Sequence, residues 1–68
     1  MTTQVAGGRL REVRQGLFLS LRALGTKAGV NYVTISRLEA NKQRATFATI
    51  RKLAAALGVE PAELVVRE

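Results

Sequence analysis

The chain has 68 residues, with eleven Lys and Arg side chains, five Asp and Glu side chains, and neither Cys nor His. This length accommodates one domain, and its core would gain from a partner subunit because so short a chain buries only ~60% of its unfolded surface. Without Cys there are no disulfides or thiolate metal sites, and without His there is neither a zinc ligand set nor the commonest general base. These absences argue against an enzyme and predict no cofactor and no metal.

The charge is unevenly distributed along the chain. Residues 9–52 carry ten basic and two acidic side chains, a local balance of +8, whereas residues 59–68 carry one basic and three acidic side chains, a balance of −2. A basic body with an acidic end favours a polyanion bound on one face. An anionic membrane is the weaker candidate, because no apolar run approaches ~18 residues and the first residues lack a signal-peptide core. We therefore expect a cytoplasmic protein that binds nucleic acid and no membrane.

The beginning of the chain divides into an arm and a first helix. Residues 1–8 are small or polar and end in two glycines, which predicts a flexible N-terminal arm ahead of a domain over residues 9–68. Apolar residues then recur at helical spacing from Leu10 to Leu17, with charged residues between them. A first amphipathic helix is therefore expected over residues 9–17.

Two short helices with clear capping signals come next. Ser20 offers an N-cap oxygen for a second helix over about residues 21–28, and Gly29 is placed to end it. Asn31 offers the next N-cap, for a third helix over about residues 32–40.

The remaining chain carries a basic loop, a strongly amphipathic fourth helix and a final turn that begins with Pro. No stretch alternates with period two, so no sheet is expected. The chain is predicted to be all-α, a compact bundle of four to five short helices. The signals behind these elements are Asn41 at the end of the third helix, the loop 42–45, Thr46 as N-cap, the apolar stripe of Phe47, Ile50, Leu53, Ala54 and Leu57, the stop at Gly58 and a last turn over residues 61–65.

Only three residues, Gly29-Val30-Asn31, separate the second and third helices. So tight a turn makes the helices cross steeply, and a steep crossing requires a small residue where they meet. Gly25 supplies it in mid-helix, where Gly otherwise costs about 1 kcal/mol relative to Ala, and Gly29 supplies the positive φ of the turn. Together these features form a helix-turn-helix pattern over residues 20–41.

Four segments match a known family: Leu19-Ser20-Leu21-Arg22-Ala23-Leu24-Gly25, Ala28-Gly29-Val30-Asn31, Thr34-Ile35-Ser36-Arg37-Leu38-Glu39 and Leu53-Ala54-Ala55-Ala56-Leu57-Gly58-Val59. In them the sequence resembles the Cro and phage-repressor type of helix-turn-helix domain, also called the xenobiotic-response-element family, over residues 10–64. The resemblance implies a lambda-repressor-like DNA-binding domain. Phe18 departs from it where a Gly usually precedes the second helix, Leu21 where a Gln often contacts DNA, and Ala40-Asn41 where a polar residue and Gly are usual.

The third helix has one side suited to a major groove. At ~100° per residue, Ile35 and Leu38 mark its buried side. Arg37 on the other side can donate two hydrogen bonds to a guanine, Ser36 can bond a base or a phosphate, and Val33 can touch a thymine methyl. The predicted DNA base contacts are Tyr32, Val33, Ser36 and Arg37.

Phosphate contacts are expected where helix N-termini and basic side chains occur together, because free N–H groups and cations both attract DNA phosphates. Four other cations, Arg9, Arg11, Arg51 and Lys52, are more typical of a solvated surface and receive no role. The predicted phosphate contacts are Ser20, Arg22, Lys27, Asn31, Lys42, Arg44 and Thr46.

Two further groups of residues are expected to have structural roles. In the family an acid that ends the recognition helix pairs with an Arg on the first helix, so the resemblance implies a mostly shielded ion pair between Arg14 and Glu39. Three apolar residues beyond the fourth helix are not part of the predicted helix-turn-helix core: Pro61, Val65 and Val66. They are the predicted dimer interface.

The predicted function is that of a sequence-specific regulator of transcription that binds double-stranded DNA. A single short recognition helix reads too few base pairs for useful specificity, which favours a homodimeric repressor on an inverted repeat. A phage repressor, a restriction–modification controller and a chromosomal regulator all fit. The alternative is an antitoxin or protein-interaction module that binds DNA together with a partner protein. No small-molecule site is expected.

Overall fold

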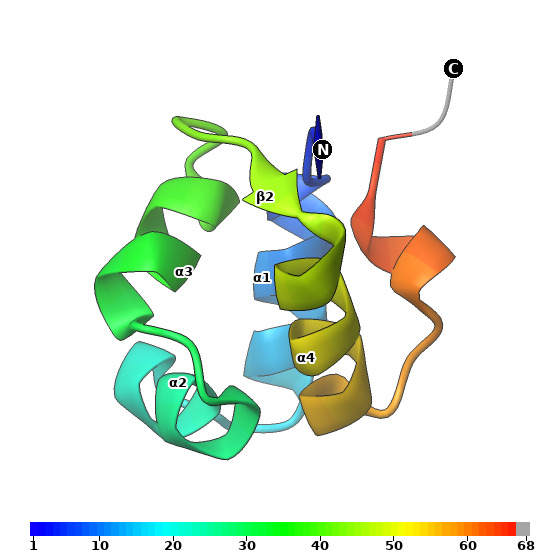
Figure 1. Cartoon of the computed structure of the whole chain (residues 1–68). Coiled ribbons are helices and arrows are strands. Elements are labelled where there is room, and N and C mark those ends of the chain that lie inside the picture. The colour runs from blue at the N-terminus through cyan, green and yellow to red at the C-terminus, as the bar shows by residue number, and fades with distance from the viewer. Residues whose placement is uncertain (67–68) are drawn as a thin grey trace.

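Helices make up most of residues 1–66, the part of the chain that this computed structural model describes (Figure 1). The predicted all-α class and the four main helices are confirmed, and α2 has its predicted bounds. The predicted third helix ends one residue earlier than expected, and the final turn is a 3-10 helix, η1. In chain order the elements are β1 (Thr2–Thr3), α1 (Gly7–Gly16), α2 (Leu21–Ala28), α3 (Tyr32–Glu39), β2 (Ala45–Thr46), α4 (Phe47–Leu57) and η1 (Pro61–Leu64).

Local capping explains where α2 and α3 begin and end. The hydroxyl of Ser20 accepts a hydrogen bond from the N–H of Ala23 at 3.0 Å, and the side-chain oxygen of Asn31 accepts one from the N–H of Val33 at 2.8 Å. Each oxygen satisfies a donor that the first helical turn would otherwise leave unpaired. Gly29 ends α2 with a φ of 71°, in the left-handed region that favours glycine. The predicted caps are confirmed.

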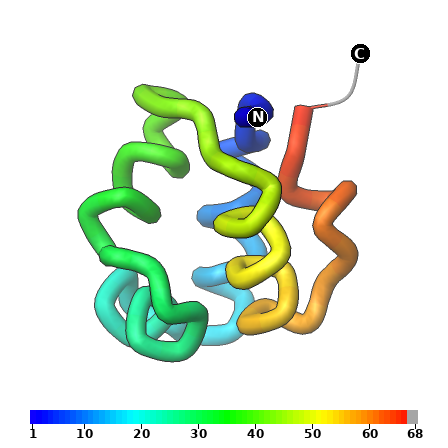
Figure 2. The backbone as a smooth tube through the Cα atoms, in the orientation of Figure 1, coloured from blue at the N-terminus to red at the C-terminus, as the bar shows by residue number. Residues whose placement is uncertain are grey.

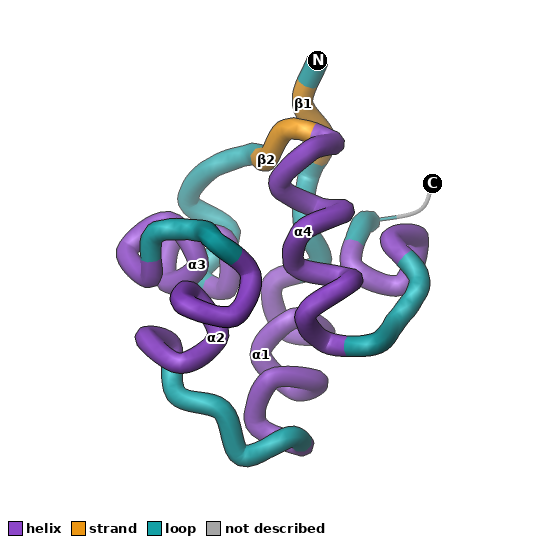
Figure 3. The backbone as a smooth tube through the Cα atoms, turned by 60° about the horizontal axis from the view of Figure 1, so that its bottom comes forward, coloured by secondary structure: helices purple, strands orange, loops and turns teal. Residues whose placement is uncertain are grey.

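The helices enclose one core, with α2 and α3 on one side, α4 and η1 on the other, and α1 behind (Figures 1 and 2). Its largest fully buried side chains come from every helical element, so no helix packs independently of the others. Figure 3 shows the loop after α3 arching toward β2, which lies beside the N-terminal strand. The fully buried side chains are Val5, Leu10, Leu24, Ile35, Leu38, Leu53 and Leu64.

The close approach of the turn after α2 to that helix depends on Gly25. A Cβ atom at this position would lie 2.6 Å from the carbonyl oxygen of Val30, a separation that real side chains do not reach. The residue is buried, and the turn passes directly over it. The small residue that the pattern required is therefore present for close approach rather than for flexibility.

The prediction of a flexible arm over residues 1–8, and with it the absence of a sheet, is corrected. Thr2 and Thr3 pair antiparallel with Thr46 and Ala45, and Val5 forms a bridge with Val65. The Val5 side chain is only 1% exposed, so an apolar anchor and backbone hydrogen bonds hold this segment. Two residues of pairing are too few to produce a period-two pattern in the sequence.

The first helix also begins earlier than predicted, at Gly7 instead of residue 9, and ends at Gly16. The Gly7 N–H donates to the side-chain oxygen of Asn41 at 3.1 Å. A Cβ atom on Gly7 would collide with the carbonyl oxygens of Leu38 and Glu39. The glycine that indicated a loose arm is instead the point where the start of α1 packs against the end of α3.

Within residues 1–66, two residues other than glycine adopt a positive φ. Asn41 has a φ of 58°, as its predicted role at the end of the third helix requires, and Phe18 also has a φ of 58°. Phe18 is 96% exposed, so no packing of its ring compensates for this conformation. An L-residue in the left-handed region costs roughly 1–2 kcal/mol. The loop into α2 therefore keeps a glycine-like backbone although a Phe occupies it.

Candidate nucleic-acid interface

The side of α3 opposite the core carries the four predicted base-contacting residues. Ile35 and Leu38 are fully buried, as the helical periodicity predicted. Tyr32 and Val33 are 39% and 41% exposed although both are large apolar or aromatic residues. Exposed side chains of this size on a short helix suit contact with a ligand better than they suit water. The exposed set consists of Tyr32, Val33, Ser36 and Arg37.

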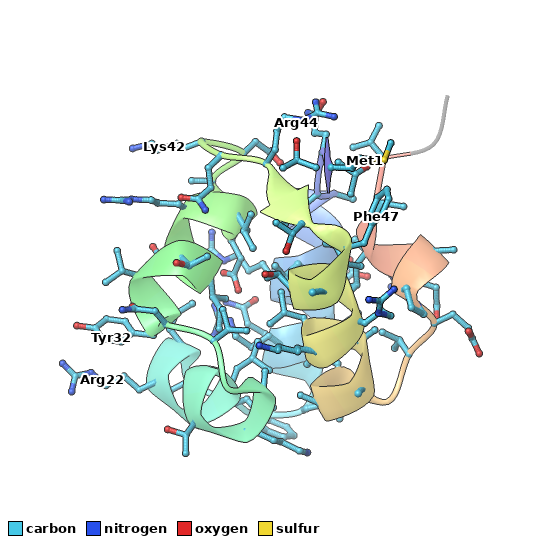
Figure 4. The ribbon with its side chains drawn as sticks, viewed as in Figure 1. Met1, Arg22, Tyr32, Lys42, Arg44 and Phe47 are labelled. Atoms are coloured by element: carbon cyan, nitrogen blue, oxygen red, sulfur yellow. The ribbon has the colours of Figure 1, made fainter. Side chains whose placement is uncertain are left out.

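Arg22 of α2 and Tyr32 of α3 contact each other across the turn. The guanidinium carbon of Arg22 lies 4.7 Å from the centre of the Tyr32 ring, and Nη2 of Arg22 donates to the Tyr32 hydroxyl at 3.3 Å. Both side chains project from the same side of the molecule (Figure 4). This cation–π contact restricts two long side chains before any ligand arrives. It lies beside an open hollow of about 460 Å³ lined by Arg22, Gly25, Thr26, Gly29, Val30, Asn31 and Tyr32.

The three polar residues predicted to contact phosphate at helix starts are all N-caps. Ser20 and Asn31 each accept from a backbone N–H, which leaves the Ser20 hydroxyl proton and the Asn31 amide available as donors. The Thr46 hydroxyl accepts from the Thr49 N–H at 3.2 Å and donates to the Thr49 hydroxyl at 3.1 Å. Thr46 therefore offers a phosphate the free N–H groups of the first turn of α4 rather than its hydroxyl.

The predicted cations do not all lie together. Lys42 projects from the loop after α3 on the same side as Arg22 and Tyr32 (Figure 4). Arg44 lies against the N-terminal strand, where Nε donates to the Thr2 hydroxyl at 3.2 Å and Nη2 to the Thr2 carbonyl at 3.3 Å. Lys27 is exposed in the last turn of α2, the end of that helix opposite Arg22.

The structure brings Arg14 of α1 and Glu39 of α3 together beneath this surface. Nε and Nη2 of Arg14 donate to the two carboxylate oxygens of Glu39 at 2.6 and 2.9 Å, and Nη1 donates to the Leu19 carbonyl at 2.8 Å. The two side chains are 10% and 8% exposed. Hydrogen bonding to Glu39 raises the pKa of Arg14 above its ordinary value. The pair links α3 to α1.

A cleft that no sequence pattern indicates is lined in part by this ion pair. The cleft has a volume of about 260 Å³, and among its lining residues are Arg11, to which no role was given, and Ser36 of α3. Nothing in the helical periodicity of α1 indicates that Arg11 lies beside α3, because the contact depends on how the two helices pack.

A second, apolar surface lies on α4 and η1. Phe47 was predicted to belong to the core stripe of the fourth helix, but it is 47% exposed. Of the predicted interface residues, Pro61 and Val65 are half-buried and Val66 is 44% exposed. Phe47 is the first residue of α4. The groove beside it has a volume of about 310 Å³ and is lined by Thr3, Phe47, Ile50, Arg51, Pro61, Ala62 and Val65.

Comparison with known proteins gives one family and several similar structures. The HTH_3 helix-turn-helix family model matches residues 10–64, and no curated protein sequence matches the chain. The restriction-modification controller protein C.AhdI from Aeromonas hydrophila is 35% identical with a TM-score of 0.81, and the match covers 84% of this chain and 86% of that one. The P22 c2 repressor, in complex with a synthetic operator, is 34% identical with a TM-score of 0.79 and coverages of 87% and 89%. SinR, the master regulator for biofilm formation, in complex with DNA, is 32% identical with a TM-score of 0.79 and coverages of 82% and 90%. Within residues 1–66, no helix has the length and hydropathy needed to cross a membrane.

Proposed function

The chain belongs to the Cro/C1-type helix-turn-helix family of DNA-binding regulators, and from this premise we propose that it is a cytoplasmic, sequence-specific transcriptional repressor that binds double-stranded DNA as a homodimer. The observation that carries the proposal is the exposed side of α3, bordered by cations of α2 and of the following loop. Two of the similar structures contain DNA, which supports the same ligand for this chain.

In this proposal α3 enters the major groove and its exposed side chains read base edges. Arg37 is the one of these side chains that can donate two parallel hydrogen bonds, which suits O6 and N7 of a guanine. Val33 presents methyl groups to a thymine methyl, and Ser36 is a donor for a base or a phosphate. Tyr32 is held by Arg22, so it approaches DNA together with a cation.

The DNA backbone is held by helix N-termini and cations on either side of the groove. Arg22 and Lys42 project beside α3 and are the leading side-chain contacts. Ser20, Asn31 and the first turn of α4 add neutral donors. Such contacts set the register of the protein on the duplex without reading sequence. Lys27 and Arg44 extend the basic surface at its margins.

The proposed dimer uses the apolar groove on α4 and η1, with Phe47 in addition to Pro61, Val65 and Val66. Support comes from the exposure of Phe47 and Val66 on one face of a domain whose own core is small. A two-fold axis through this face would place the recognition helices on one side of DNA, with half-site centres about 34 Å apart.

Selection of bound sites from random duplex DNA is the experiment that tests the function. We expect an inverted repeat, and two chains bound per selected site. Insertion of about five base pairs, half a turn, between the half-sites should abolish tight binding because one recognition helix then faces away from its groove. Failure to enrich any sequence would overturn the sequence-specific function, and one chain per site would overturn the dimer.

A further inference from the structure

The three arginines of α1 differ in whether a carboxylate neutralises them. Arg9 donates to Glu12 at 2.8 Å and to Glu63 at 3.3 Å. Arg14 forms the ion pair with Glu39. Arg11 lies between them on the same helix and, within residues 1–66, forms no salt bridge. The positive charge of Arg11 is therefore available to an outside partner.

Arg11 lines the cleft between α1, α2 and α3. The Arg14–Glu39 pair also lines the cleft, and its two charges cancel. Arg11 thus gives the cleft its net charge, and Ser36 contributes a hydroxyl that donates to no other side chain in the described part of the chain. A cation and a hydroxyl donor around a cleft of this size suit one phosphate group. The lining residues are Arg11, Arg14, Leu21, Ser36, Glu39 and Ala40.

The position of the cleft connects it to the surface that reads bases. Ser36 is on α3 directly before Arg37, and Leu21 is the first residue of α2. A phosphate bound here would therefore belong to a DNA strand that borders the groove occupied by α3. Two exposed donors hold a free ion weakly in water, but on DNA the same contact also releases condensed counterions.

We propose that Arg11 and Ser36 together bind one DNA backbone phosphate, which makes Arg11 a DNA contact and assigns Ser36 to the backbone rather than to a base. This rests on the proposed function, because it assumes that α3 lies in the major groove. The proposed contact adds α1 to the elements that hold the DNA backbone. Its cleft is separate from the hollow beside Asn31 and the turn between α2 and α3.

The salt dependence of duplex binding tests the role of Arg11, and Arg9 provides a matched control on the same helix. Arg11→Ala should weaken binding about tenfold on cognate and random duplexes alike, and it should reduce the slope of log K against log salt by about one. Arg9→Ala removes the same charge but should leave the slope unchanged, because Arg9 is already paired. Arg11→Lys should restore most of the slope. Because Arg11 is exposed, its variants should have the same melting temperature as the parent.

Replacement of single phosphates by neutral methylphosphonates locates the contact. At one position in each half-site, neutralising the phosphate should weaken DNA binding by the parent protein but should not change binding by Arg11→Ala. Binding by Ser36→Ala should be much less sensitive than that of the parent to neutralisation at the same position. An equal slope loss in Arg9→Ala and Arg11→Ala, or the absence of any such position, would overturn the inference while leaving the proposed function intact. A parent protein that binds no duplex at all would overturn the proposed function itself.

Discussion

The side of the molecule formed by α2 and α3 differs from the side formed by α4 and η1 in how its exposed residues are held. On the first side, hydrogen bonds and a cation–π contact fix polar groups in place, as in Arg22 with Tyr32 and Asn31 with Val33. The second side exposes the large apolar side chains of Phe47 and Val66 beside charged residues such as Arg51, and a backbone hydrogen bond from Val66 to Gln4 holds the segment after η1. The polar groups of the first side are therefore positioned before a ligand binds, whereas Phe47 and Val66 on the second side offer apolar surface for burial.

This difference predicts two different responses to solution conditions. Charged and polar contacts to DNA weaken as salt rises, because counterions compete with the protein for phosphates. Burial of apolar area between two copies depends instead on protein concentration and is little affected by salt. Variants on both sides should lower the occupancy of an operator. Those on the first side should change its dependence on salt, and those on the second side its dependence on protein concentration.

The largest expected effect comes from removing the ion pair beneath the polar side. Glu39→Ala leaves Arg14 nearly buried with only the Leu19 carbonyl as a partner, so the free energy of unfolding should fall by about 3 kcal/mol. Urea denaturation followed by circular dichroism measures the change. The control is Glu12→Ala, which breaks an exposed ion pair with Arg9 and should have the same free energy of unfolding as the parent. Equal stability of Glu39→Ala and the parent would show that the pair does not hold α3 in place.

The next effect concerns base reading. Arg37→Ala should lose about 1–3 kcal/mol of binding free energy on the selected site and relax preference at one position in each half-site. Its binding to random duplex should change less, since a base contact is absent there. Titration of both duplexes by fluorescence anisotropy measures the difference. Equal weakening on the two duplexes would reassign Arg37 to the backbone.

A smaller change of opposite sign is expected in the loop that leads into α2. Phe18→Gly should raise the free energy of unfolding by about 0.5–1 kcal/mol, because Gly adopts a φ of 58° without steric cost and an exposed ring loses no packing. Phe18→Ala keeps the backbone strain and should show no such gain. Thermal melts of the three proteins decide the matter, and a destabilised Phe18→Gly would mean that the ring contributes to the fold.

Changes in the salt dependence of binding are expected in the basic loop. Lys42→Ala should reduce the slope of log K against log salt by about one, and Arg44→Ala should reduce it by less, because the Arg44 guanidinium is hydrogen-bonded to Thr2. Duplex titrations at several salt concentrations between about 50 and 200 mM compare them. If Arg44→Ala has the larger effect, then Arg44 leaves the N-terminal strand when DNA binds.

Local signals allowed the helix-turn-helix to be predicted from the sequence. Ser20, Asn31 and Gly29 act on groups within four residues of themselves, so their caps and turns can be recognised without knowledge of the fold. The buried stripe of Ile35 and Leu38 follows from helical periodicity in the same way. These signals supply most of the recognition surface.

Long-range contacts account for what was missed. Val5 was assigned to an arm because its partner, Val65, lies sixty residues away in the chain. Arg44 was treated as a free cation because its partner is Thr2 of the same N-terminal strand. The exposure of Arg11 beside Ser36 depends on the packing of α1 on α3, which no pattern within α1 encodes.

The N-terminal strand also has a consequence for how the protein is made. Residues 2–6 contact β2 and residues 64–66, with the Ala6 N–H donating to the Leu64 carbonyl at 2.8 Å and the Val66 N–H to the Gln4 carbonyl at 3.0 Å. During synthesis Val5 leaves the ribosome long before residues 64–66, whose backbone pairs with its own segment. The helices can form from local contacts as they emerge, whereas this pairing cannot close until residues 64–66 have emerged. A nascent chain arrested before residue 64 should therefore leave its first residues accessible to protease.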